Sequence, residues 1–200
     1  MPPRGLPDDP LKITDPAAMR ALAHPLKWTL MDVLLTEGTA TSTRCAELTG
    51  ESQANCSFHL RQLARYGLVE EASSRSKKER PWRLTTVSQS WSRQQPDPER
   101  AAAAAELEQV FVQHEFATLM RWVRTAAAYG DDWQRASMRA GAVAWLTPDE
   151  LAGLRDQVEE LMVSYGDRVA DPAKRPDGSR LVRLFSAAYP LPEEGRGGTA

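Results

Sequence analysis

The side chains best suited to chemistry lie in one short stretch of this sequence, residues 52–67. Read with helical periodicity, Cys56, Leu60 and Leu63 fall on one side of a helix. Amides, a hydroxyl, an aromatic ring and guanidinium groups can reach base edges and phosphates in a major groove. The other side of the helix and its flanks carry such groups on Gln53, Asn55, Ser57, Phe58, Arg61, Gln62 and Arg65. The stretch therefore predicts a helix that contacts duplex DNA, with Arg65 near phosphate and the rest near bases.

The neighbouring residues predict the elements that would position this helix. Ser52 is a good N-cap and Gly67 a good C-terminal stop, so the helix is expected from about Gln53 to Tyr66. A shorter helix is expected over 41–48, with Gly50 in the turn between the two. This order is typical of a helix-turn-helix.

Two supporting helices and a hairpin flank the pair. The supporting helices are expected over 17–23 and 26–37. Two short strands, 68–71 and 81–85, enclose a basic, serine-rich loop that is expected to act as a wing. Four basic residues of this hairpin are expected to contact phosphates or the minor groove: Arg75, Lys77, Lys78 and Arg80.

Three blocks in this order resemble the winged helix-turn-helix of ArsR-type bacterial transcriptional regulators: residues 21–27, 57–63 and 67–69. The resemblance covers residues 16–85. It implies a homodimeric transcriptional regulator on a palindromic operator, with repression as the favoured mode. Many ArsR-type repressors sense metals through a Cys-x-Cys pair or His/Asp clusters. This chain has neither, so we expect no metal and no cofactor.

The second half predicts a dimer helix and a small domain. Apolar residues recur at helical spacing over 99–129, a length of some 45 Å that exceeds what a small domain needs. We therefore expect its positions Val110, His114, Ala117 and Met120 to lie along a dimer seam. A strand over 135–146, a helix over 148–165 and a strand over 180–189 are expected to follow; Thr147 to Glu150 form a capping-box pattern.

The large apolar residues of this half can serve either of two structural roles. They can form the core of a small α+β domain. They can also line a pocket for a small apolar effector, since such pockets combine apolar walls with a few polar groups. The candidate ligand residues are Trp122, Trp133, Trp145 and Phe185.

The predicted fold class is mainly α with a small β component (α+β). The predicted domains are a flexible arm (1–12), a winged helix-turn-helix (13–86), a linker (87–98), a dimerisation and regulatory domain (99–191) and a flexible tail (192–200).

Charge and composition restrict the classes of function. Residues 41–85 hold eight basic and five acidic side chains, net +3, whereas 97–170 hold seven and thirteen, net −6. Known catalytic motifs, a membrane span and a signal peptide are not recognisable, so we expect a cytoplasmic non-enzyme, with Cys45 and Cys56 packed in the core. The alternative left open is a winged-helix protein-interaction module without operator binding.

Overall fold

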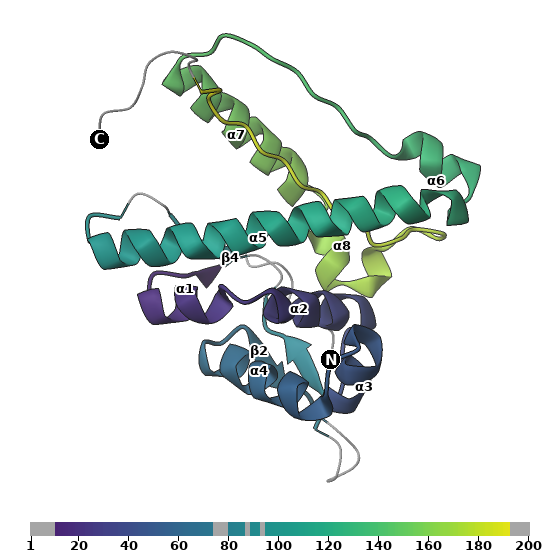
Figure 1. The fold of residues 1–200 in the computed structure, drawn as a ribbon. Coiled ribbons are helices and arrows are strands. Elements are labelled where there is room, and N and C mark those ends of the chain that lie inside the picture. Colours follow the sequence, from purple (N-terminus) through teal and green to yellow (C-terminus); the bar gives the residue numbers. More distant parts are fainter. Residues whose placement is uncertain (1–10, 74–79, 87–88, 93–94, 193–200) are drawn as a thin grey trace.

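The computed structural model of the 200-residue chain describes residues 11–73, 80–86, 89–92 and 95–192. These residues are mainly helical, with two small two-stranded sheets. In the view of Figure 1, the four N-terminal helices and the hairpin lie below the long helix α5 (Pro98–Thr125), and α7 (Pro148–Val163) lies above it. The predicted α+β class is confirmed.

Each of the four N-terminal helices is preceded by an N-cap residue, whose side chain accepts a hydrogen bond from a backbone N–H of the first turn. Proline at the first position of the first two helices fixes a helical φ without losing a needed donor. The helices and their caps are α1 (Pro16–Leu22, Asp15), α2 (Pro25–Glu37, His24), α3 (Ser42–Thr49, Thr41) and α4 (Gln53–Arg65, Ser52). The predicted bounds are confirmed within one residue.

Two glycines set the geometry around α4. Gly50, in the turn after α3, has φ 76°, and Gly67, just past α4, has φ 72°, a left-handed region that favours glycine. The strands β2 (Val69–Glu71) and β3 (Trp82–Leu84) then pair antiparallel, as predicted for the wing. We call α1 to α4 with β2 and β3 the reader domain.

A second, parallel sheet was not predicted. It joins β1 (Leu11–Lys12) to β4 (Gln89–Ser90), and the backbone N–H of Ile13 donates to the carbonyl of Ser90 at 2.8 Å. β1 lies at the end of the predicted arm and β4 within the predicted linker. Two-residue strands carry too little periodicity to be found from sequence.

The core of the reader domain includes part of α5. Met19 and Leu22 of α1 and Leu60 of α4 are fully buried, together with Ala104 and Leu107 of α5. Residues far beyond the wing therefore help to close the core beneath the predicted reading helix.

The long helix α5 is close to its predicted span. It begins after Asp97, which caps it, and ends at Thr125, followed by a short 3-10 turn, η1 (Ala126–Ala128). At 1.5 Å per residue its 28 residues extend about 42 Å. Of the expected seam positions, Ala117 and Met120 are exposed. Val110 packs against the core, and His114 faces α2 instead.

Beyond α5, both predicted strands were wrong. Residues 131–136 form the helix α6 (Asp131–Ala136), and residues 137–147 have no regular structure. Residues 180–189 are extended but pair with no strand among the described residues, and most of them are exposed. Apolar side chains alone do not make a strand; a strand also needs a partner edge for its backbone groups.

The predicted helix between those segments is confirmed. α7 begins with the predicted capping box, in which Thr147 and Glu150 exchange side-chain and backbone hydrogen bonds. A short helix, α8 (Asp167–Ala170), and a 3-10 turn, η2 (Pro172–Lys174), follow. None of the described residues of α7 is buried.

Four charged or ionisable side chains join α2, α5 and the C-terminal segment, and we call them the ionic cluster. His114 Nε2 lies 2.8 Å from the Asp32 carboxylate, and Arg183 donates to Glu115 at 3.0 Å and also to Asp32. Glu115 is only 3% exposed. Burial raises the pKa of Glu115 against the opposing charge of Arg183. Burial would also raise the pKa of Asp32, but the His114 hydrogen bond and the Arg183 charge outweigh burial, so the pKa of Asp32 is lowered.

Candidate nucleic-acid interface

The two faces of α4 differ as its sequence predicts. Cys56, Leu60 and Leu63 are buried against the rest of the reader domain, and His59 is buried beside them. Gln53, Phe58, Arg61 and Arg65 are exposed, and Asn55, Ser57 and Gln62 are half-buried at the flanks. Four of the seven predicted contact residues of α4 therefore lie on its exposed face, and the other three lie at the edges of that face.

Four of these seven residues take part in three intramolecular side-chain hydrogen bonds. Asn55 donates to Glu51 at 2.9 Å, Arg61 donates to Ser57 at 2.8 Å, and the Gln62 carbonyl oxygen accepts from Lys27 at 2.6 Å. A base or phosphate would have to replace these bonds. The contacts hold the side chains in place before any partner arrives, which reduces the entropy lost on binding.

The described part of the wing keeps its cations partly neutralised. Arg83 lies 2.6 Å from Glu70 across the two strands, and the exposed Arg80 lies 3.5 Å from Glu71. Arg75, Lys77 and Lys78 lie outside the described residues. Their contact with phosphate remains a prediction.

The four candidate ligand residues have separate neighbours. Trp145 is fully exposed, whereas Trp122 and Trp133 are half-buried beside the guanidinium groups of Arg139 and Arg180 respectively. The Phe185 ring lies 6.2 Å from Phe111 and 6.1 Å from Phe116. The structure does not gather the four into one site, and an effector at these residues remains a prediction.

Sequence reasoning missed Lys27. This residue lies on the otherwise apolar side of α2, is 2% exposed and donates to the carbonyl of Ala21 and to Gln62. Its neighbour Gln62 is 35 positions away in the sequence, so no local periodicity predicts the pair. A lysine within an apolar stripe was the only available signal.

The cysteines are packed as expected: Cys45 and Cys56 are free thiols in the core, and burial raises the pKa of Cys45 to about 11. Within the described ranges, no group of three or more His, Cys, Asp or Glu side chains is placed to hold a metal ion. No helix there has both the length and the apolar character needed to cross a bilayer.

The order α2, α3, α4, β2, β3, with α4 presenting its polar face, defines the winged helix-turn-helix class. No protein-family model matches the chain, and a search of curated proteins found no relative. Two solved structures of a mutant ZitR from Lactococcus lactis, one of them in apo form, are similar at 16% identity and TM-score 0.29. They align over 69% and 68% of this chain and 73% and 83% of theirs. A solved structure of a mutant MarR from E. coli is similar at 14% identity and TM-score 0.26, over 73% of this chain and 76% of its own.

Proposed function

We propose that this chain is a homodimeric, sequence-specific DNA-binding transcriptional regulator of ArsR type, with repression as the favoured mode. The observation that carries the proposal is the difference between the two faces of α4. Its apolar face is buried in the reader domain, and amide, hydroxyl and guanidinium groups stand together on the accessible face. That set matches the hydrogen-bonding pattern of base edges in a major groove.

Two copies of α4 would read half-sites about one turn, or about 10 bp, apart in a roughly palindromic operator. On each half-site, Gln53, Asn55, Ser57, Phe58, Arg61 and Gln62 would lie near bases and Arg65 near phosphate. Arg80 and the wing residues Arg75, Lys77 and Lys78 would contact phosphates or the minor groove. These basic groups would supply the salt-dependent part of the affinity.

The Arg61→Ala variant tests this proposal. Arg61 is exposed, and its one side-chain hydrogen bond among the described residues goes to Ser57, so it can form a bidentate contact with a guanine. Its removal should weaken operator binding by about 1–3 kcal/mol and relax preference at one base position. The operator is first selected from a random duplex library with the full chain. Fluorescence anisotropy at fixed salt then compares the variants.

The control is Arg155→Ala, which removes an exposed arginine of α7 that pairs with Asp156. It should leave operator affinity unchanged. If Arg61→Ala combined with Ser57→Ala also left affinity unchanged, α4 would not be the reading helix. If the library yielded no preferred duplex at all, the protein-interaction alternative would replace the proposal.

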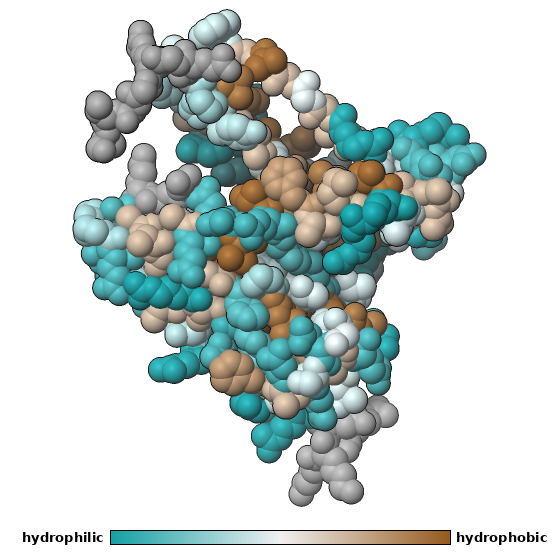
Figure 2. Space-filling model, viewed as in Figure 1, coloured by the Kyte–Doolittle hydropathy of each residue, from teal (hydrophilic) through white to brown (hydrophobic). Residues whose placement is uncertain are grey.

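The homodimer is supported by a half-exposed apolar stripe on α5. Phe116, Leu119, Met120 and Val123 follow i, i+3, i+4, i+7 spacing and are 40–54% exposed. Figure 2 shows hydrophobic surface, coloured brown, over α5 and over the C-terminal part above it. A contiguous stripe of this kind on a helix is typical of an interface.

The Met120→Gln variant tests this interface. Glutamine keeps the length and helix preference of methionine but places an amide in the seam. Burying a polar group without a partner costs about 1–3 kcal/mol, so the dimer dissociation constant should rise about fivefold or more. Analytical ultracentrifugation measures it. Met138→Gln, the same change at an 85% exposed residue outside the regular structure, is the control and should leave the constant unchanged.

The regulatory part of the proposal is a small apolar effector at Trp122, Trp133, Trp145 and Phe185. Its support is the apolar surface of this half: Trp145, Met138 and Val143 are all more than 80% exposed. An effector there would act on operator affinity only if it bound the two conformations of the dimer with different affinities.

A further inference from the structure

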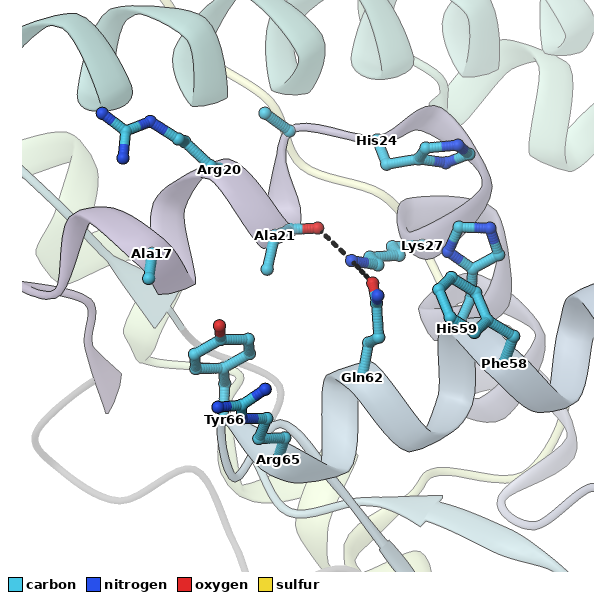
Figure 3. Close-up of a pocket in the computed structure, with 11 residues that line it drawn as sticks. Ala17, Arg20, Ala21, His24, Lys27, Phe58, His59, Gln62, Arg65 and Tyr66 are labelled. Carbon is cyan, nitrogen blue, oxygen red and sulfur yellow. Dashed lines mark hydrogen bonds between the residues drawn. The ribbon is translucent and has the colours of Figure 1, made fainter.

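A pocket of about 580 Å³ lies on the side of α4 that faces α1 and the start of α2. Figure 3 shows side chains from all three helices around it. Lys27 and Arg65 supply its positive charge, and His24, His59 and Tyr66 supply rings; the third cation, Arg20, pairs with Glu99 at 2.9 Å. None of the described residues that line it is acidic. Its volume is that of a small-molecule site.

Lys27 lacks a counter-ion in this pocket. Its ammonium lies between Ala21 and Gln62 (Figure 3), and both hydrogen bonds go to neutral oxygens. Within the described residues it forms no ion pair, although it is 2% exposed. Burial lowers the pKa of Lys27 because a buried charge without a partner is unfavourable. One ammonium N–H remains for an anionic oxygen.

The neighbouring histidines also leave hydrogen-bonding capacity. His59 is 6% exposed, and its Nδ1 has no hydrogen-bond partner among the described residues. Its ring lies 4.3 Å from the ring of His24, whose own Nδ1 accepts from the backbone of Leu26. Burial, followed by the charges of His24 and Lys27, lowers the pKa of His59. The pocket therefore holds a buried nitrogen without a partner in addition to an ammonium without a counter-ion.

We propose that this pocket binds a small organic carboxylate, whose oxygens pair with Lys27 and whose apolar part lies against the rings of His24 and His59. A monoanion matches the single buried cation, whereas a phosphate dianion would leave one charge buried without a partner. A phosphate of duplex DNA could reach the exposed Arg65 at the rim. Lys27 is only 2% exposed, so a small free anion fits it better than a phosphate that belongs to a duplex.

Occupancy would change the reading surface of α4. One oxygen of the carboxylate takes the remaining N–H of Lys27, and the other competes with Gln62 for a second N–H, so the Gln62 amide is released next to Phe58 and Arg65. A ligand at this site would thereby alter operator affinity. This coupling rests on the proposed function; the binding of the carboxylate does not.

The test uses sodium benzoate as the probe and the three histidine rings as reporters, at constant ionic strength. In ¹H–¹⁵N spectra of the full chain, benzoate should shift the His24 and His59 signals saturably and raise the pKa of the His59 ring. His114, in the ionic cluster, is an internal control and should not respond. Non-saturable shifts, or equal shifts at His114, would overturn the proposal.

Lys27→Met should weaken benzoate binding about tenfold or more, since it removes a charge-assisted hydrogen bond. Lys174→Met removes an exposed lysine from the C-terminal part and should bind benzoate as the wild type does. Gln62→Leu should tighten binding, because Lys27 loses a competing acceptor. The Gln62→Leu variant therefore still tests the site if Lys27→Met does not fold. Unchanged affinity in both Lys27→Met and Gln62→Leu would overturn the site.

The second part of the test is a competition experiment with duplex DNA. If a short random-sequence duplex displaces benzoate and gives the same His59 shift, the anion in the pocket is a backbone phosphate and the free-carboxylate proposal fails. If benzoate binds without changing operator affinity, the coupling fails and the site stands. If no duplex binds, the proposed function fails, while the histidine titration still decides the pocket.

Discussion

Replacing Leu107 by alanine should lower the free energy of unfolding by about 2–5 kcal/mol, the cost of removing a buried leucine from a close-packed core. Leu107 is fully buried although it belongs to α5 rather than to the reader domain. Urea unfolding followed by circular dichroism, at one protein concentration, measures the change.

The control is Leu161→Ala on α7, where leucine is 62% exposed; it should change stability by no more than about 0.5 kcal/mol. A loss below about 1 kcal/mol in Leu107→Ala would mean that α5 is dispensable for the core. The expected result has a corollary for domain boundaries. A fragment that ends after the wing would expose Met19 and Leu22, and should not retain the reader fold.

Arg183→Met should cost about 3 kcal/mol at pH 7.5, the low end for breaking a buried ion pair, since Arg183 itself is partly exposed. The change leaves Glu115 buried without its cation. The loss should shrink as the pH falls to 5. Burial raises the pKa of Glu115, and without Arg183 this pKa rises further, so the carboxyl binds a proton more readily and is tolerated in its neutral form.

The direction of this pH dependence follows from linkage. A group whose folded-state pKa is raised favours the folded state at low pH, and this contribution is lost as pH rises through that pKa. Urea unfolding of wild type and variant at both pH values measures the difference. The matched control is Glu115→Gln with Arg183→Met. It should be more stable at pH 7.5 than Arg183→Met alone, because the Glu115 charge is gone and Asp32 keeps its hydrogen bond to His114. An equal loss at both pH values would assign the effect to packing rather than to charge.

The reader domain could be predicted because its signals are local. Ser52 and Thr41 cap helices through N–H groups three residues away, and the helical spacing of Cys56, Leu60 and Leu63 is visible within one window. The same holds for the capping box of α7. These interactions depend on neighbours that any correct helix assignment already supplies.

The sequence gives no such signal for the contacts that complete the pocket and the ionic cluster. Lys27 meets Gln62 across 35 positions, and Arg183 meets Asp32 across 151. The two false strands share this cause. Residues 135–146 and 180–189 are apolar enough for strands, but pairing depends on a distant edge that the sequence does not reveal.

The length of α5 has a mechanical consequence for a dimer. The helix holds the reader core at Leu107 and the half-exposed stripe near Met120, with no proline or glycine between them, so both sites belong to one stiff rod. The two sites are 13 residues apart, about 20 Å along the helix, so a pivot of about 10° at one site moves the other by about 3.5 Å. That displacement is close to the rise of one base pair. In the proposed dimer, a small change of angle at the α5 stripe would therefore put the two α4 helices one base pair out of register with a fixed operator.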